Sequence, residues 1–122
     1  MMRNIPSMTH GVLDYLVGLV LIVAPWLFNF SSISIACYIS ILVGSVIIIY
    51  SLQTNYELGV VKVIPMQTHL ILDLTVGAVL ALSPWFFNFR QSVYLPHLVV
   101  GILIIGVSFL SSPVAYKKRS RI

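Results

Sequence analysis

The sequence contains the same segment twice, and this repeat constrains the fold more than any other feature. Residues 5–30 read IPSMTHGVLDYLVGLVLIVAPWLFNF, and residues 64–89 read IPMQTHLILDLTVGAVLALSPWFFNF. Fifteen of the 26 aligned positions are identical. Because a repeated sequence folds into a repeated unit, we expect the chain to consist of two copies of one structural element.

The composition is that of an integral membrane protein. Hydrophobic residues make up 59% of the 122 residues and charged residues only 8%, whereas soluble domains carry about 25% charged residues. A chain of this length has room for one domain, whose core could not hide so much apolar surface from water. The single cysteine, Cys37, lies in an apolar run, so we expect a buried thiol and neither an intramolecular disulfide nor a thiolate metal site.

Four apolar segments predict an all-α polytopic membrane protein. We expect helices at about 6–28, 33–52, 65–87 and 93–111, so that each repeat (5–53 and 64–112) forms a helical hairpin. Counted only after the aspartates, the first and third segments would reach about 21 and 24 Å, too short for a hydrocarbon core of about 30 Å. Both helices must therefore begin before Asp14 and Asp73, which places these carboxylates in or against the bilayer.

Prolines and polar residues mark the limits of the first and third helices. Pro6 and Pro65 suit a first helical turn, and Thr9 and Thr68 are candidate caps. At the other end, asparagine can take the left-handed conformation that ends a helix, and aromatic side chains suit the membrane interface. We therefore expect interfacial anchors at Pro25, Trp26, Asn29, Pro84, Trp85 and Asn88, with Phe28, Phe30, Phe87 and Phe89 beside them.

Basic residues are distributed unequally between the two ends of the predicted helices. One end has only Arg90, whereas the other has six, at Arg3, Lys62, Lys117, Lys118, Arg119 and Arg121. Because cytoplasmic loops are enriched in Lys and Arg, we expect both termini and the middle loop to be cytoplasmic. Two hairpins inserted the same way round are related by a pseudo-twofold axis along the membrane normal. The basic tail, 113–122, is expected to contact anionic lipid headgroups and not nucleic acid.

Two histidine–aspartate pairs are the polar groups that the repeat preserves. They are His10, Asp14, His69 and Asp73, called the His–Asp cluster below. Each pair is spaced four residues apart, so its members share one helical face. Because that face is the same in both copies, we predict that it lies at the pseudo-axis and that the four side chains converge there. Gly18 and Gly77 continue the face by one turn and are expected to let the first and third helices approach closely.

The residue types of the His–Asp cluster are compatible with four roles. Hydrogen bonds between imidazole and carboxylate can fix helix rotation at an interface, and the same groups can bind zinc, iron or manganese. Two histidines can also be axial ligands of haem, and a His–Asp chain can carry protons or ions. The last role is disfavoured because the outer halves of the spans are apolar, with His97 expected at the headgroups. Common catalytic motifs are absent from the sequence, and no cofactor is demanded by it.

The repeated pattern also resembles a known family. HxxxD is followed about fifteen residues later by APW at 24–26 and by SPW at 83–85, and this pattern is similar to the SPW-repeat family of small bacterial integral membrane proteins. The resemblance covers both repeats and implies two transmembrane helices per repeat, a location in the bacterial inner membrane and no established activity.

We therefore expect a non-catalytic membrane module or accessory subunit, either as a homo-oligomer or with a partner membrane protein. In this interpretation the paired His–Asp faces organise the helix interface. The alternative is a metal- or haem-binding membrane protein that uses the His–Asp cluster, and a proton or ion pathway is less favoured.

Overall fold

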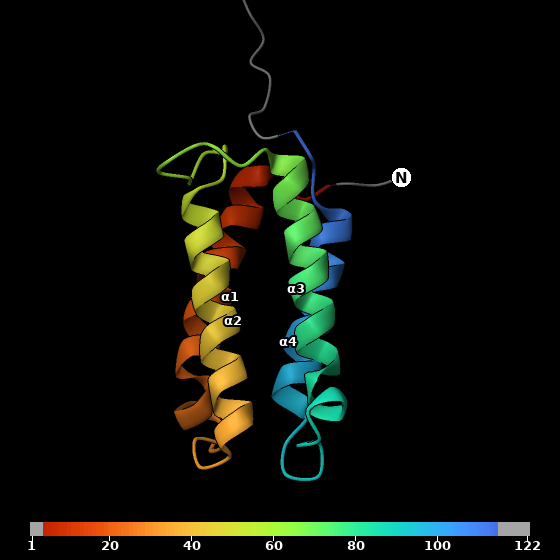
Figure 1. Cartoon of the computed structure of the whole chain (residues 1–122). Helices are drawn as coiled ribbons and strands as arrows, with labels where there is room; N and C mark the ends of the chain where they lie inside the picture. The colour runs from red at the N-terminus through yellow and green to blue at the C-terminus, as the bar shows by residue number, and fades with distance from the viewer. Residues whose placement is uncertain (1–3, 115–122) are drawn as a thin grey trace, which may run out of the picture.

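The structure, a computed structural model, describes residues 4–114, which form four α-helices (Figure 1). The helices are α1 (Ser7–Leu27), α2 (Ser34–Leu52), α3 (Met66–Phe86) and α4 (Leu95–Leu110). Across residues 4–114 the only extended pairing is two isolated backbone bridges. The prediction of an all-α protein with four helices is confirmed. Arg3 and most of the predicted basic tail, 115–122, lie outside the described residues.

Helices α1 and α3 each begin one residue after a proline. Pro6 and Pro65 are the N-cap residues, and both have extended backbone conformations. A proline at the boundary has no N–H group of its own, so it removes one of the four donors that a helix start leaves without a partner within the helix, which suits a start inside a membrane. The prediction that Thr9 and Thr68 are caps is wrong, because both lie within the helices and no side chain caps either start. Both helices begin before their aspartates, as the length argument requires.

The same two helices end at left-handed asparagines. Asn29 and Asn88 both have φ of 63°, a conformation that asparagine tolerates better than most residues. The chain reverses there because the N–H groups of Phe30 and Phe89 donate to the carbonyl oxygens of Pro25 and Pro84, each at 2.8 Å. The helix-ending role predicted for the asparagines is therefore present in both repeats.

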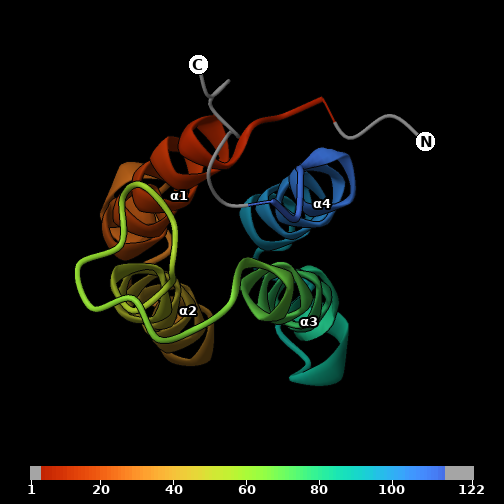
Figure 2. The same cartoon turned by 90° about the horizontal axis from the view of Figure 1, so that it is seen from above.

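Viewed along the bundle, the helices form a ring in chain order, with α1 diagonal to α3 (Figure 2). Contacts are most extensive within each hairpin, α1 with α2 and α3 with α4. The hairpins meet where α2 packs on α3 and, less extensively, where α1 packs on α4. Each helix gives the core one large aliphatic side chain that is at most 5% exposed, namely Leu21, Ile47, Leu80 and Ile104.

Glycines allow the close approach within each hairpin. A Cβ atom on Gly18 would lie 3.0 Å from the carbonyl oxygen of Gly44, and one on Gly77 would lie 3.0 Å from that of Gly101. The expected packing of Gly18 and Gly77 between the first and third helices is therefore wrong. Because α1 and α3 are diagonal in the ring, their glycines face α2 and α4 instead.

Two backbone bridges join the repeats at the end opposite the hairpin turns. Ile5, which precedes α1, pairs with Ser111, which follows α4; Ile64, which precedes α3, pairs with Thr54, which follows α2. Each bridge therefore connects the beginning of one repeat to the end of the other. The bridges also bring Thr54 and Ser111 to the same end of the bundle.

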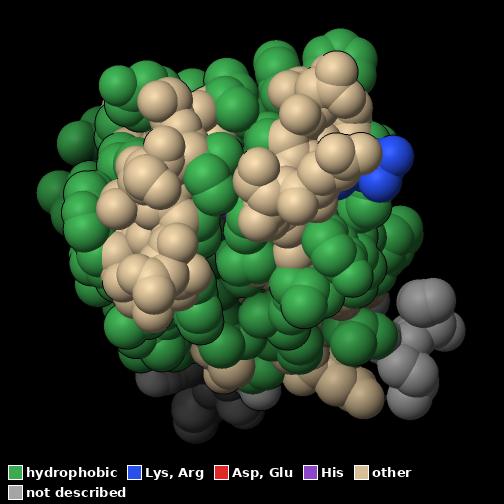
Figure 3. Space-filling view, turned by 90° about the horizontal axis from the view of Figure 1, so that it is seen from below, with side chains coloured by type: hydrophobic (Ala, Val, Ile, Leu, Met, Phe, Trp, Pro, Cys, Tyr) green, Lys and Arg blue, Asp and Glu red, His purple; other side chains and the backbone are tan. Residues whose placement is uncertain are grey.

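The outer surface of the bundle is apolar. Helices α1, α2 and α3 have 21, 19 and 21 residues and are apolar enough to cross a membrane. Helix α4 has 16 residues, fewer than expected, and reaches about 24 Å. Large apolar side chains such as Leu16, Leu42 and Leu82 are more than half exposed. Hydrophobic side chains dominate the view from the hairpin-turn end (Figure 3). The chain is a multi-pass membrane protein whose exposed surface suits lipid.

Candidate functional site

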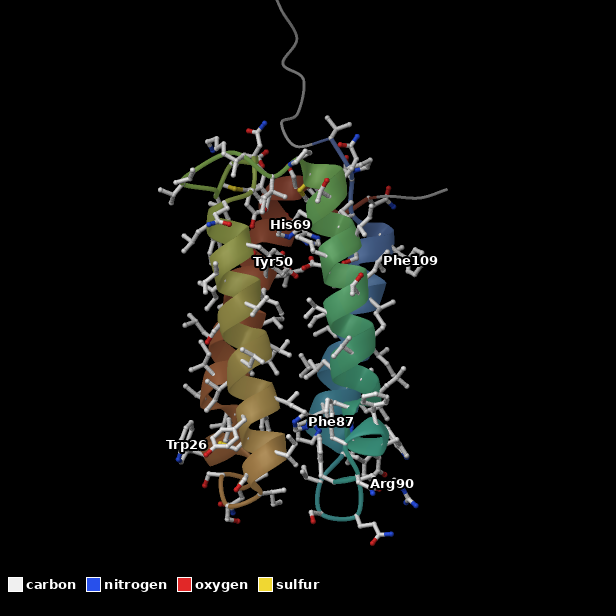
Figure 4. All side chains as sticks on the ribbon, in the orientation of Figure 1. Trp26, Tyr50, His69, Phe87, Arg90 and Phe109 are labelled. Atoms are coloured by element: carbon white, nitrogen blue, oxygen red, sulfur yellow. The ribbon has the colours of Figure 1, made fainter. Side chains whose placement is uncertain are left out.

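Helices α1 and α3 carry the His–Asp cluster to the centre of the bundle. The spacing of four residues places each histidine one turn above its aspartate on the inward face of the helix. His10 and His69 are fully buried, and Asp14 and Asp73 are 5% and 1% exposed. In Figure 4, His69 lies in the upper part of the bundle, near the end that carries the middle loop. The structure thus brings together all four side chains, as the repeat predicts.

The strongest contacts in the cluster cross between the repeats. His10 Nε2 lies 2.7 Å from Asp73 Oδ2, and His69 Nε2 lies 2.5 Å from Asp14 Oδ2. Within each helix the corresponding distances are longer, 3.0 Å for His10–Asp14 and 3.3 Å for His69–Asp73. The two imidazole rings also contact each other edge to face, with their centroids 5.2 Å apart. Each histidine therefore makes its shortest contact with the aspartate of the other repeat.

Two hydroxyl groups determine which nitrogen of each imidazole carries a proton. The Thr54 hydroxyl donates to the Tyr50 carbonyl oxygen at 2.7 Å, and the Ser111 hydroxyl donates to the Val107 carbonyl oxygen at 2.6 Å. Each hydroxyl oxygen also lies 2.7 Å from a histidine Nδ1 atom, and it can only accept there, because its single hydrogen is already used. The Nδ1 atoms of His10 and His69 are therefore protonated, and both Nε2 atoms face the carboxylates.

This arrangement requires a cation among the four inner atoms. A neutral imidazole with its proton on Nδ1 presents a lone pair at Nε2. A carboxylate oxygen within 2.7 Å also presents a lone pair, so each cross-repeat contact is favourable only with a positive species between the two atoms. One shared proton for each contact satisfies this requirement, and so does a metal ion. The four candidate ligand atoms lie within 4.8 Å of one another.

Tyr50 makes the cluster asymmetric. Its hydroxyl on α2 donates to Asp73 Oδ1, and its ring packs edge to face on His69 with centroids 5.1 Å apart. Val107 occupies the equivalent position on α4 and offers Asp14 no such donor. Asp73 therefore has a partner for each carboxylate oxygen, and it is the more deeply buried of the two aspartates.

The middle loop covers the cluster on the side of the first repeat. Tyr56 is fully buried, and its ring centroid lies 5.3 Å from that of His69. The loop is held on α1 by two hydrogen bonds, from Ser7 Oγ to Glu57 Oε1 at 2.7 Å and from Tyr15 to the Leu58 carbonyl oxygen at 2.8 Å. Burial raises the pKa of the Tyr56 phenol, so this residue stays neutral. The loop therefore covers the cluster beside His69.

The repeated PWxFNF segments lie at the opposite end of the bundle. Trp26 and Trp85 are 62% and 44% exposed, which suits interfacial anchors, whereas Pro25 and Pro84 are buried in the last helical turns. Figure 4 shows Trp26 pointing outward at this end.

In the core at the hairpin-turn end, the positions of three aromatic residues differ from what the sequence predicts. Phe30 and Phe89 are buried and pack on His97, whose Nε2 atom lies 3.0 Å from the Ala36 carbonyl oxygen. The expectation that His97 lies at the headgroups, and that these two phenylalanines belong to an interfacial belt, is therefore wrong. Because the chain reverses after each asparagine, the last aromatic residue of the motif returns to the core.

The core between His97 and the His–Asp cluster is apolar in the part of the chain that the structure describes. Leu21, Ile47, Leu80 and Ile104 fill the centre at this level. They leave no polar chain between the two ends of the bundle, so the structure gives no support to a proton or ion pathway. Haem is also a poor fit, because the two imidazoles contact each other and each Nε2 faces a carboxylate.

Sequence reasoning missed Thr54, Ser111 and Tyr50. A signal for the first two is present, because the second helices also repeat, with an offset of 57 residues in place of 59. At this offset Gly44 aligns with Gly101, Ser51 with Ser108 and Thr54 with Ser111. These two identities and one conservative match are sparse in runs of Ile, Val and Leu, which is why they are less visible than the repeat of the first helices.

The comparisons with known proteins identify one family. A family model described as the SPW repeat domain matches residues 8–111, which include all four helices except the first residue of α1. Neither the curated proteins nor the solved structures gave a match.

Proposed function

This chain belongs to the SPW repeat domain family, and from that premise we propose that it is a non-catalytic membrane module or the accessory subunit of a membrane assembly. In this role the His–Asp cluster determines how the two hairpins fit together. The hairpins are otherwise joined by modest contacts of α2 with α3 and of α1 with α4, and by the two backbone bridges at the same end. Apolar side chains alone give little preference for one helix arrangement in lipid, where tails are as apolar as leucine.

The observation that carries the proposal is the exchange of partners between the repeats. The contacts of His10 with Asp73 and of His69 with Asp14 are shorter than the contacts within each helix. A shift of one hairpin by a helical turn would break both exchanged contacts and leave each buried carboxylate only the longer contact within its own helix. Because such a loss costs about 3–5 kcal/mol for a buried pair, the cluster favours one register of the bundle.

We also propose that the cluster end faces the cytoplasm of a bacterial inner membrane. Lys62 lies in the middle loop at that end, and Arg90 lies in the opposite hairpin turn, where Figure 4 shows it at the bottom of the bundle. The remaining basic residues, at 3 and 117–121, lie outside the described residues, and their number supports this orientation. In this orientation the basic tail would contact anionic lipid headgroups, and Trp26 and Trp85 would anchor the outer interface. Partners of the module would be a second copy of the chain or another membrane protein.

A double-mutant cycle across the exchanged contact tests the role in joining the hairpins. We expect His69→Gln and Asp14→Asn each to lower the free energy of unfolding in mild detergent by about 2–4 kcal/mol, because each leaves a buried polar group without its partner. The double variant should lose at least about 1 kcal/mol less than the sum of the two single losses.

Thr75→Val is the matched control. Thr75 also lies on α3, but its hydroxyl is exposed and bonds only to the Ile71 carbonyl oxygen, so the change should stay within about 0.5 kcal/mol. The cluster does not join the hairpins if the two single variants are as stable as this control. The same conclusion follows if the loss of unfolding free energy in the double variant equals the sum of the two single losses.

A further inference from the structure

We infer that the His–Asp cluster is a binding site for one divalent transition-metal ion. Each of the four residues offers one ligand atom within 4.8 Å of the others, and the short contacts identify these ligands as Nε2 of His10 and His69 and Oδ2 of Asp14 and Asp73. The ion would replace the two shared protons and would join the same four side chains. The inference therefore rests on the proposed function for the position of the hairpins, and it adds the chemical identity of what binds between them.

The first argument is the direction of the lone pairs. Because Thr54 and Ser111 hold the Nδ1 protons, the Nε2 lone pairs of both imidazoles point into the cluster. Metal-binding histidines commonly donate the other ring N–H to a protein oxygen, which fixes the tautomer and orients the ring. Both histidines here have that outer hydrogen bond before any ion arrives. A histidine pair that only held the helices together would not need the proton of both rings to be fixed on Nδ1.

The second argument is the spacing of the ligand atoms. In a tetrahedral site with bonds of about 2.0 Å, neighbouring ligand atoms are about 3.3 Å apart. Each imidazole Nε2 lies 2.7 or 2.5 Å from the carboxylate of the other repeat, and 3.0 or 3.3 Å from that of its own helix. To reach that spacing, the two exchanged pairs of atoms need to separate by about 0.6 and 0.8 Å, and the pairs within each helix by at most about 0.3 Å.

The third argument is charge and donor type. Two carboxylates balance a divalent cation, so the occupied site is neutral, which a membrane interior favours. Imidazole and carboxylate donors suit Zn²⁺, Fe²⁺ and Mn²⁺, whereas Cu⁺ prefers sulfur ligands. The only cysteine, Cys37, lies on α2, outside the set of candidate ligands. Four buried protein ligands match the closed, four-coordinate structural sites of zinc, so Zn²⁺ is the ion we expect to bind best.

The fourth argument is the outer hydrogen bond of one carboxylate, that of Asp73. Tyr50 donates to Asp73 Oδ1, which leaves Oδ2 of the same carboxylate for the ion. A single-oxygen contact from each aspartate is what a tetrahedral site of four residues requires. The hydroxyls of Thr54, Ser111 and Tyr50 therefore form a set of outer groups around the four ligands.

Metal loading of the full chain in detergent is the direct test. We expect the wild-type protein, incubated with Zn²⁺ and freed of excess metal, to retain about one zinc per chain in elemental analysis. Loading with Co²⁺ should give the intense visible absorption of a tetrahedral site, which Zn²⁺ then abolishes. Asp73→Asn and His69→Gln should each lose the bound metal and the absorption.

His97→Gln is the matched control, since His97 is equally buried but bonds only to a backbone carbonyl. It should retain full metal content. Ser111→Ala is a milder variant that keeps all four ligands, and it should weaken Zn²⁺ affinity by about 10- to 100-fold, as loss of an outer hydrogen bond does. This variant keeps the inference testable where a ligand variant fails to fold.

The outcomes separate the metal site from the joining role. The metal site is overturned if the wild-type protein retains no Zn²⁺ and shows no tetrahedral Co²⁺ spectrum. If His69→Gln is still destabilised in that case, the joining role remains supported. Metal binding that survives in Asp73→Asn and His69→Gln also overturns the metal site. A third outcome is that the wild-type protein binds one zinc per chain while the metal-free cluster variants are all as stable as Thr75→Val. That outcome would support the metal site and reject the joining role.

Discussion

Two hydroxyl groups outside residues 5–30 and 64–89 determine the tautomers of His10 and His69. Thr54 and Ser111 each donate to a carbonyl oxygen one turn back in the chain and then accept the Nδ1 proton of a histidine. Without these acceptors, an imidazole could place its proton on Nε2 and satisfy a carboxylate as an ordinary neutral donor. With them, the inner side of the cluster consists of lone pairs and needs a proton or a metal ion.

Tyr50 provides a test at the scale of a single residue. Tyr50→Phe removes the hydroxyl that donates to Asp73 Oδ1 but keeps the ring that packs on His69. We expect the variant to lose about 1–3 kcal/mol of unfolding free energy, because a buried carboxylate oxygen is left without a donor. Thermal unfolding followed by circular dichroism measures the loss.

Tyr38→Phe is the control for this prediction. The Tyr38 side chain is 68% exposed on the same helix, so its hydroxyl is free to bond water or lipid headgroups. The melting temperature of this variant should stay that of the wild type. An equal loss in both variants would mean that the contact with Asp73 does not stabilise the protein.

At the scale of the helices, each hairpin depends on a pair of facing glycines. A Cβ on Gly44 would lie 2.6 Å from the Gly18 carbonyl oxygen, and a Cβ on Gly101 would lie 2.6 Å from both the Gly77 carbonyl oxygen and the Ala81 backbone nitrogen. These obstacles are backbone atoms, which cannot move unless the helices separate. The distance between the two helices of a hairpin is therefore set by these four residues.

Alanine substitutions of the glycines of α4 test this packing. Gly101→Ala should lower the unfolding free energy by about 1–3 kcal/mol, because the added methyl group forces α3 and α4 apart. Gly106→Ala on the same helix is the control, since its added Cβ meets no described atom within 4 Å apart from its chain neighbours and the backbone of its own helix, and it should be neutral or stabilising by up to about 1 kcal/mol. Chemical unfolding in detergent measures both, and equal stability of the two variants would contradict the packing.

The sequence predicts the helices and the meeting of the His–Asp pairs because both depend on local spacing. His10 and Asp14 share a helical face whatever the tertiary fold, and the repeat then requires His69 and Asp73 to do the same. The packing of Gly18 and the burial of His97 could not be predicted in this way. They depend on the order of helices around the ring, which places α1 diagonal to α3, and on the backbone reversal at Asn29 and Asn88. The outer hydroxyls were missed because their repeat has a different offset.

At the scale of the whole molecule, the two ends differ in chemistry. One end holds the buried polar cluster under the middle loop, and the other holds the exposed tryptophans and Arg90. A bilayer that surrounds the apolar surface must therefore have the cluster near one interface and the tryptophans near the other. The proposed orientation assigns the first interface to the cytoplasm.

Labelling of single cysteines tests this orientation. In a Cys37→Ala background, Val60→Cys lies in the middle loop and Gln91→Cys in the second hairpin turn, and both positions are exposed. We expect a membrane-impermeant maleimide to label Gln91→Cys in intact cells with a permeabilised outer membrane, and to label Val60→Cys only after lysis. The reverse pattern would contradict the orientation and would leave the cluster itself unaffected.

The exchange of partners between the repeats also bears on the ancestry of the protein. Two identical copies of one hairpin, related by a twofold axis, would supply the same four inner side chains, because each of the two shortest contacts pairs a histidine of one copy with an aspartate of the other. A gene encoding a single hairpin could thus have given a working homodimer before duplication and fusion. After fusion the two halves can differ in sequence. They differ at equivalent positions of the second helices, where Tyr50 corresponds to Val107 and Ser40 corresponds to His97.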